Sequence, residues 1–171
     1  MTRQSILVAG IGNVFLGDDA FGVEVARRLQ TLPLPPQVLV RDFGIRGFDL
    51  AYALLENPEL VILVDAAQRG LPAGSLQVLE PEFLETAAHD HDRHSPQTHS
   101  MVPTRAIEMA RAMGATPARM YIVCCEPATF GPPETGREGL SAPVALAVEG
   151  AVRLIEQLID QHLHALCTNS R

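Results

Sequence analysis

Short apolar runs alternate along the chain with segments whose apolar side chains recur every three to four residues. A run of this kind, closed by a glycine or an acidic residue, is typical of a strand buried in a sheet. The runs predict strands at residues 5–9, 38–40, 60–64, 75–79 and 120–125, the fourth of them at an edge of the sheet. The periodic segments predict helices at residues 21–29, 48–55, 103–113 and from 141 onward.

Residues at the expected helix ends support these boundaries. Pro103 suits a first helical position and Gly114 a C-terminal stop. Ser141 is expected as the N-cap of the last helix, with Pro143 just inside it. Strands that alternate with helices predict an α/β fold with a mostly parallel sheet of about five strands and helices on both faces. The sequence shows no repeat and no linker, so we expect a single domain over residues 1–171.

Composition and charge exclude several classes of protein. Of the 171 residues, 47% are hydrophobic and 19% are charged, which is a globular composition. The net charge of −7 argues against a nucleic-acid or membrane-surface binder and favours a soluble monomer. All 13 basic residues are Arg, so the lysine that phosphate-loop ATPases and pyridoxal-phosphate enzymes require is absent.

The cysteines and the first residues bear on the cellular compartment. Cys124 and Cys125 are neighbours, Cys167 is the third cysteine and no CxxC occurs, so neither a disulfide framework nor a thiolate zinc site is expected. The neighbouring pair is expected to be buried in a strand. The first ten residues do not resemble a signal peptide, and no apolar run approaches the roughly 18 residues of a membrane span. We therefore expect a cytoplasmic protein.

Acidic residues follow the predicted strands, at what becomes one edge of a parallel sheet. They are Asp18, Asp19, Asp42, Asp65 and Glu126. Asp18 is expected to cap the helix that follows it, whereas Asp19 lies one residue further in and suits capping less well. The glycine turn before them has the spacing G-x-G-x-x-x-x-G, which departs from the dinucleotide fingerprint, and the two carboxylates repel phosphate. The turn therefore argues against nucleotide binding.

One carboxylate and one histidine are candidate metal ligands. Asp65 closes an apolar strand, and a buried carboxylate needs a proton, a cation or hydrogen-bond donors. His99 precedes a predicted helix, from where it can reach the strand edge, although a lone histidine is more often an ordinary loop residue. Two carboxylates and one imidazole suit a divalent ion such as nickel or zinc. A polar loop that we expect to be solvated, with loose metal chelation as the alternative, contains His89, His91 and His94.

Four motifs occur in order along the chain. They are Gly10-Ile-Gly-Asn-x-x-x-Gly-Asp-Asp-x-x-Gly-Val, Asp42-Phe-Gly-x-x-Gly, Val64-Asp-Ala and His99 before a helix. Together they resemble the motifs of the NiFe-hydrogenase maturation endopeptidases. The resemblance implies a three-layer α/β sandwich around a twisted, mostly parallel sheet. It also implies removal of a C-terminal extension from a hydrogenase large-subunit precursor after nickel has been inserted.

By this resemblance the metal-contacting positions fall on Asp19, Asp65 and His99. The nickel is expected to arrive with the substrate and to act as the recognition element, although another divalent metal can occupy the site. Cleavage is expected to use Asp19 or Asp65 as a general base on water, with metal polarisation of the carbonyl as the alternative. The sequence contains neither HExxH nor G-x-S-x-G, so a self-contained zinc protease or an α/β-hydrolase-type serine protease is not expected.

The second motif implies substrate binding by Asp42, Gly44 and Gly47. Phe43 departs from the family pattern, which often has glycine there, and the variable position Arg46 is expected to bear on which hydrogenase is recognised. Two other functions stay open on the sequence. One is a non-hydrolytic nickel-binding maturation chaperone, and the other is a nucleotide-dependent enzyme of doubly wound fold.

Overall fold

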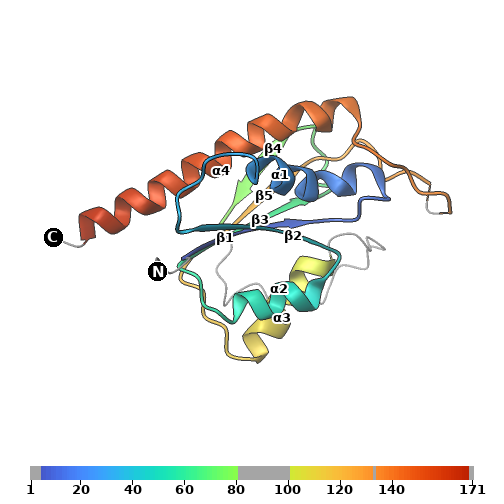
Figure 1. The fold of residues 1–171 in the computed structure, drawn as a ribbon. Coiled ribbons are helices and arrows are strands. Elements are labelled where there is room, and N and C mark those ends of the chain that lie inside the picture. The colour runs from blue at the N-terminus through green and yellow to red at the C-terminus, as the bar shows by residue number, and fades with distance from the viewer. Residues whose placement is uncertain (1–4, 81–100, 133, 170–171) are drawn as a thin grey trace.

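A five-stranded sheet forms the middle layer of the protein (Figure 1). The computed structural model describes residues 5–80, 101–132 and 134–169. The strand order is β2-β1-β3-β5-β4, with the first four strands parallel and β4 antiparallel to β5. The strands are β1 (Ile6–Ile11), β2 (Val38–Gly44), β3 (Leu60–Ala66), β4 (Leu76–Leu79) and β5 (Met120–Cys125).

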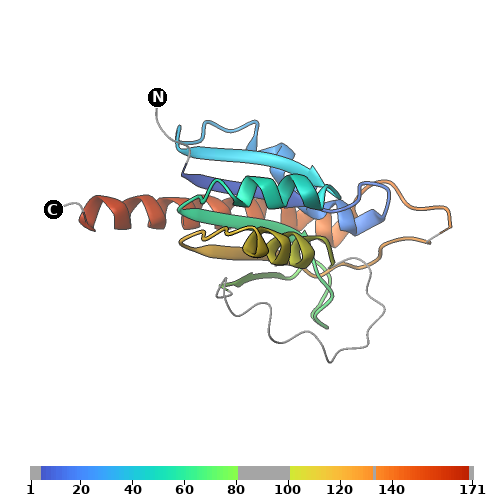
Figure 2. The same cartoon turned by 90° about the horizontal axis from the view of Figure 1, so that it is seen from below.

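Helices cover both faces of the sheet and complete the three layers. They are α1 (Phe21–Leu29), α2 (Gly47–Leu54), α3 (Met101–Ala112) and α4 (Ala142–Asn169), with a short 3-10 turn η1 (Gly17–Ala20) before α1. Helices α1 and α4 lie on one face, and α2 and α3 lie on the other (Figures 1 and 2). The C-terminal part of α4 extends past the sheet in both views. Among the described helices, none has the length and apolar character needed to cross a membrane.

Alternation along the central strand β3 divides the core into two parts. Ile62 and Val64 pack in the cluster under α1 and α4, whereas Val61 and Leu63 pack in the cluster under α2 and α3. Successive side chains of a strand point to opposite faces, so Asp65 continues the row of Val61 and Leu63. The Asp65 carboxyl group therefore projects on the α2 and α3 side of the sheet.

The predicted fold class is confirmed, and the differences are at the ends of elements. Strands β2 and β3 continue to Gly44 and Ala66, so Asp42 and Asp65 lie inside strands rather than after them. The extension follows from pairing, because Asp42 is opposite Gly10 and Asp65 is opposite Cys124. Helix α3 begins two residues before Pro103. Proline is tolerated there because the first four N–H groups of a helix have no partner within the helix.

Two glycines allow α1 to lie directly on the strands beneath it. A Cβ on Gly22 would lie 2.0 Å from the Val64 carbonyl oxygen, and one on Gly10 would lie 2.3 Å from the Gly22 carbonyl oxygen. Side chains at either position would push the helix away from the sheet. The close approach brings the start of α1, and with it η1, against the ends of β1 and β3.

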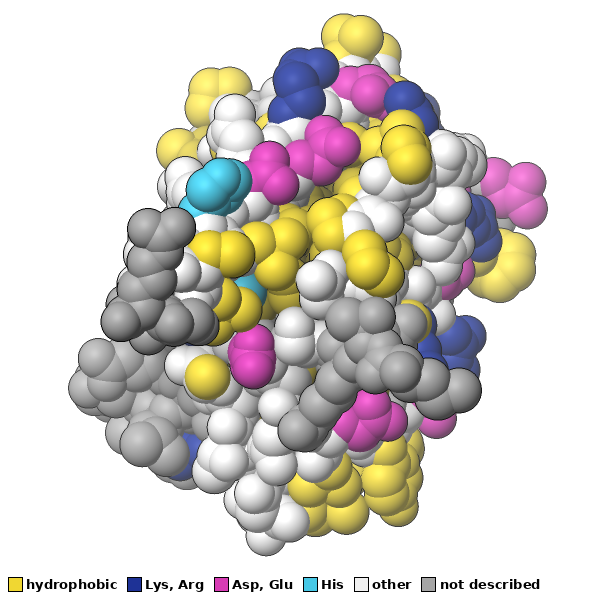
Figure 3. Space-filling view, turned by 60° about the vertical axis from the view of Figure 1, so that its left-hand side comes forward, with side chains coloured by type: hydrophobic (Ala, Val, Ile, Leu, Met, Phe, Trp, Pro, Cys, Tyr) yellow, Lys and Arg dark blue, Asp and Glu magenta, His cyan; other side chains and the backbone are white. Residues whose placement is uncertain are grey.

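A cavity of about 400 Å³ lies at the opposite, amino-terminal edge of the strands. It is lined by Ile6, Leu7, Leu39, Arg41, Ala53, Glu56 and Pro58. Figure 3 looks onto this side of the molecule and shows hydrophobic side chains gathered at its centre, with acidic side chains above and below them. The cavity is at the far end of α2 from the predicted substrate segment, so it is separate from the site described next.

Candidate active site

The structure brings Asp19 and Asp65 together at the carboxyl edge of the sheet. Asp19 lies in η1 and Asp65 in β3, and each residue is 4% exposed. The Asn13 N–H donates to Asp19 Oδ2 at 2.8 Å, and the Ala66 N–H donates to Asp65 Oδ1 at 2.8 Å. Two buried carboxyl groups at one place are the central feature of the candidate site.

Burial and the neighbouring charge shift the protonation of this pair. Burial, and after it the charge of Asp19, raises the pKa of Asp65 well above its ordinary value, against the hydrogen bond from Ala66. Asp65 therefore keeps its proton to higher pH than an exposed aspartate does. A divalent cation beside the two carboxyl groups would relieve the same repulsion that the proton relieves.

The structure supplies two of the three predicted metal ligands. His99 lies outside the described residues, as do His89, His91 and His94. Over residues 5–80, 101–132 and 134–169, no three His, Cys, Asp or Glu side chains form a group able to bind a metal ion. Among the described residues, Asp19 and Asp65 are therefore the two predicted ligands that lie together.

Asp18, the neighbour of Asp19, has a different task, and the prediction that it caps the following helix is wrong. Its Oδ2 accepts hydrogen bonds from the Ala128 N–H at 2.7 Å, the Thr129 N–H at 3.0 Å and the Ser141 hydroxyl at 2.8 Å. Its Oδ1 accepts from the Ser141 N–H at 2.6 Å. Neither η1 nor α1 has a side-chain cap. Ser141 does precede α4 as predicted, but its hydroxyl bonds to Asp18.

Backbone hydrogen bonds fix the glycine turn from both sides. The Gly17 N–H donates to the Arg137 carbonyl at 2.7 Å, and the Arg137 N–H donates to the Phe15 carbonyl at 2.8 Å. On the other side, the Gly12 N–H donates to the Gly44 carbonyl at 3.0 Å. A Cβ on Gly12 would lie 1.7 Å from the Asp19 carbonyl oxygen, and its φ is +138°. The turn therefore needs glycine at residue 12 to place Asp19.

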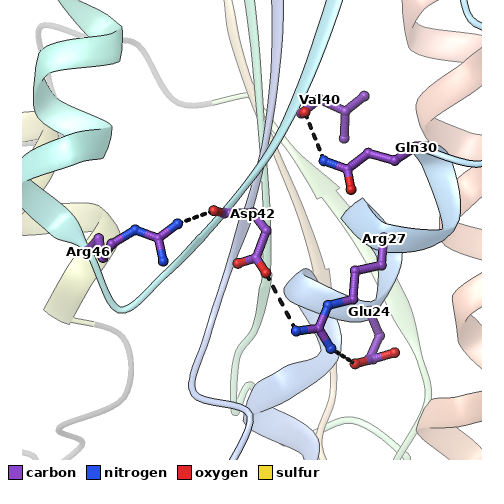
Figure 4. Close-up of polar contacts among 6 residues, drawn as sticks. All are labelled: Glu24, Arg27, Gln30, Val40, Asp42 and Arg46. Carbon is purple, nitrogen blue, oxygen red and sulfur yellow. Dashed lines mark hydrogen bonds and ion pairs between the residues drawn. The ribbon is translucent and has the colours of Figure 1, made fainter.

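The predicted substrate segment lies beside the acid pair and not within it, because β2 is the edge strand. Figure 4 shows Asp42 between two arginines. Arg27 Nη2 lies 3.7 Å from Asp42 Oδ2, and the Arg46 guanidinium donates to the Asp42 carbonyl oxygen. Gly44 has a φ of +54°, and Gly47 begins α2. Asp42 is half-buried and Arg46 is exposed, so this segment faces solvent.

Phe43, the residue that departs from the family pattern, is part of the core. The Phe43 side chain is buried in the core under α2 and α3, so it takes no space at the site. Ile45 in the segment and Phe48 directly after it are exposed instead. Their exposure has no sequence signature, because apolar residues occur both in the core and on the surface.

The remaining predicted groups at this edge are structural. Both carboxylate oxygens of Glu126 accept backbone hydrogen bonds from the loop after β3. Cys124 and Cys125 are buried in β5, as predicted, and the described cysteines form no disulfide. Burial, with nearby negative charges, raises the pKa of Cys125 to about 12. A thiol with so high a pKa is a poor nucleophile at neutral pH.

A buried carboxyl pair at the carboxyl edge of a parallel sheet is typical of an α/β enzyme that uses acid–base or metal chemistry. Comparison with known proteins gives the class of enzyme. Residues 23–158 match the family HycI, described as hydrogenase maturation protease, and the chain belongs to this family. It is therefore a peptidase that acts in hydrogenase maturation.

Individual relatives are similar to this protein over nearly the whole chain. A Methanocaldococcus jannaschii protein named as a hydrogenase maturation protease is 30% identical over 159 residues, which are 91% of this chain and 96% of the relative. The hydrogenase 2 maturation protease of Escherichia coli is 27% identical over 151 residues, covering 88% and 87%. The structure of the hydrogenase maturating endopeptidase HybD from E. coli superposes with a TM-score of 0.77, at 26% identity over 94% of each chain.

Proposed function

We propose that this peptidase removes the C-terminal extension of a NiFe-hydrogenase large-subunit precursor after nickel insertion, and that nickel in the substrate is the recognition element. The observation that carries the proposal is the buried pair of Asp19 and Asp65. Family membership supports processing of a hydrogenase precursor. The acid pair supports the second part of the proposal, which is that the enzyme distinguishes a nickel-loaded precursor from a metal-free one.

Electrostatics give the pair its preference for a loaded substrate. Burial, and after it the charge of Asp19, makes ionisation of Asp65 costly and raises its pKa. Nickel accepts carboxylate and imidazole ligands, so Asp19 and Asp65 would supply oxygen atoms and His99 a nitrogen atom. A precursor that carries nickel relieves the repulsion as it binds, whereas a metal-free precursor leaves it in place.

For cleavage, we infer that a carboxylate of the pair acts as general base. The carboxylate takes a proton from water, the water oxygen attacks the scissile carbonyl carbon, and the proton passes to the leaving amine as the C–N bond breaks. A raised pKa suits Asp65 to this exchange, because a catalytic base works best when its pKa approaches the ambient pH. Polarisation of the carbonyl by the metal is the alternative.

The segment from Asp42 to Gly47 is proposed to contact the body of the precursor. It is next to the glycine turn through the Gly12–Gly44 hydrogen bond and carries the exposed Arg46 and Ile45. The solvent-facing side chains can therefore meet a protein surface while the substrate's C-terminal segment reaches the acid pair. A cytoplasmic monomer, expected from the sequence, suits this role and stays a prediction.

Mass spectrometry of a hydrogenase large-subunit precursor tests the proposal. Nickel-loaded and metal-free precursor are each incubated with wild type, Asp65→Ala and Asp19→Asn, and Asp160→Asn is the matched control because that carboxylate is exposed on α4. We expect one C-terminal fragment, only from loaded precursor, and only with wild type and Asp160→Asn.

Other outcomes separate the parts of the proposal. Equal cleavage of both precursors would refute nickel as the recognition element. Full activity of Asp19→Asn would exclude Asp19 as the base. No fragment, with nickel bound by this protein, would favour the non-hydrolytic nickel-binding chaperone.

A further inference from the structure

Residues 67–75 form the loop between β3 and β4. In the chain this loop begins directly after Ala66, and in space it lies beside the end of β5. The Ala67 N–H donates to the Cys125 carbonyl at 3.0 Å. Farther along, the Gly74 N–H donates to the Glu126 carbonyl at 2.8 Å, and the Glu126 N–H donates to the Ser75 carbonyl at 2.9 Å. Both ends of the loop are therefore fixed to β5.

The side chain of Glu126 fixes the middle of the same loop. Its Oε2 accepts a hydrogen bond from the Arg69 N–H at 2.8 Å, and its Oε1 accepts one from the Gly70 N–H at 3.3 Å. Glu126 is 7% exposed, so these bonds form away from solvent. Hydrogen bonds to an ionised carboxylate are stronger than neutral ones. Gly70 has a φ of +78°, a turn that lets two successive N–H groups point to one side chain.

The loop held by Glu126 carries the exposed side chain of Arg69. It lies at the carboxyl edge of the sheet, where Asp19 and Asp65 also lie. Arg69 forms no ion pair with any residue in the described part of the chain. Cys124 is the register partner of Asp65 on the neighbouring strand, and their side chains share a face of the sheet. Arg69 comes four residues after Asp65 along the chain, and its N–H is bonded to the side chain of Glu126, directly after β5. The Arg69 side chain therefore starts from the same carboxyl edge of the sheet as Asp65.

The positive charge of Arg69 affects which substrate segments can bind at the carboxyl edge of the sheet. Asp18, Asp19, Asp65 and Glu126 are buried acids there, and the whole chain has a net charge of −7. Such an edge repels a substrate segment that carries a carboxylate. The planar guanidinium of arginine presents paired donors that match a carboxylate.

We propose that Arg69 binds an anionic side chain of the substrate close to the cleaved bond, and that Glu126 is the positioning residue that places Arg69 there. The inference rests on the proposed endopeptidase function and deepens it. It names the substrate class as precursors with an Asp or Glu within a few residues of the cut. Arg69 then determines specificity, and the backbone bonds of Glu126 keep its loop from moving away.

Steady-state cleavage of the nickel-loaded precursor at several salt concentrations tests the role of Arg69. Arg69→Ala is expected to raise KM about tenfold and to change kcat much less, while Arg69→Lys recovers part of the loss. The wild-type KM should rise with ionic strength, and the KM of Arg69→Ala should not. Arg153→Ala is the matched control, because it removes one positive charge from an exposed position on α4.

A double-mutant cycle tests the role of Glu126. Glu126→Ala should raise KM nearly as much as Arg69→Ala, and the two changes together should add little further. Glu126→Gln, which retains an acceptor oxygen, should show a smaller effect, and it serves if Glu126→Ala does not fold. A melting temperature for each variant separates loss of fold from loss of binding.

The outcomes distinguish this inference from the function on which it rests. If wild type cleaves no precursor, the proposed function fails, and this inference fails with it. If wild type cleaves, but the KM of Arg69→Ala and its salt dependence match wild type, this inference alone is overturned. Full additivity of Glu126→Ala and Arg69→Ala would overturn the positioning role of Glu126.

Discussion

Removing the carboxylate of Asp18 is expected to destabilise the fold strongly. In Asp18→Ala, the N–H groups of Ala128, Thr129 and Ser141 lose their acceptor, and so does the Ser141 hydroxyl. A buried donor without an acceptor costs about 1–3 kcal/mol, so the three backbone donors give about 3–9 kcal/mol. The hydroxyl can turn to another acceptor, and the variant no longer buries a charge, which reduces the total. We expect the free energy of unfolding to fall by about 3–5 kcal/mol, out of the roughly 5–15 kcal/mol of a typical domain.

The effect of Asp18→Ala should also depend on pH. Burial alone would raise the pKa of Asp18, but the hydrogen bonds from Ser141, Thr129 and Ala128 outweigh it, and the pKa is lower than the ordinary 3.8. An acid whose pKa is lowered in the folded state stabilises the fold fully above its unfolded-state pKa. That contribution is lost as the pH falls through the folded-state value. The difference between wild type and Asp18→Ala should be constant at neutral pH and shrink below about pH 4.

Urea denaturation followed by circular dichroism measures these differences. Asp18→Asn keeps one acceptor oxygen and should lose about 2 kcal/mol. Asp49→Asn is the control, because Asp49 is exposed and pairs with Arg46 at 3.1 Å. An exposed pair of this kind contributes at most about 1 kcal/mol. The reasoning is refuted if Asp18→Ala costs no more than Asp49→Asn.

Three further predictions follow from the geometry. Gly12→Ala places a Cβ 1.7 Å from the Asp19 carbonyl oxygen, so thermal unfolding should show a Tm lower by roughly 10 °C, and an unchanged Tm would contradict the backbone position. Asp65→Asn should abolish cleavage and yet stabilise the free protein by about 1 kcal/mol at pH 7. The reason is that an acid with a raised pKa destabilises the fold once the pH exceeds its unfolded-state pKa, so urea titrations should show the gain vanish below about pH 4. Maleimide at pH 8 should label only Cys167 in the native protein and all three cysteines in urea, as counted by mass spectrometry. The reason is that Cys124 and Cys125 are buried, and the pKa of Cys125 is about 12.

Hydrophobic patterning was enough to predict the fold. The apolar runs marked all five strands, and the position of the fourth at an edge is confirmed by the strand order. The strand ends were placed too early at Asp42 and Asp65, because a polar residue stays in a strand when a neighbouring strand still pairs with it. That pairing belongs to the three-dimensional structure and is not visible in the sequence of either strand.

The candidate site was predictable only in part, and Asp18 shows why. Asp18 and Asp19 are adjacent and chemically identical, so patterning cannot tell which one accepts structural hydrogen bonds. The donors that decide the matter are backbone N–H groups 110 to 123 positions away in sequence. Backbone donors have no sequence signature, and the same holds for the bonds from Arg69 and Gly70 to Glu126. The pairing of Asp19 with Asp65 was found because the motif resemblance supplied it.

The long span between Asp18 and its donors has a consequence for the order of events during synthesis. Translation produces the glycine turn and both acids of the pair within the first 65 residues, but Ser141, which donates two hydrogen bonds to Asp18, comes 123 positions after it. Until that stretch has left the ribosome, the turn that carries Asp19 lacks its anchor. Contacts this far apart form late and slow folding. A nascent chain therefore cannot complete the hydrogen bonds that hold the turn carrying Asp19 until most of the protein has been made.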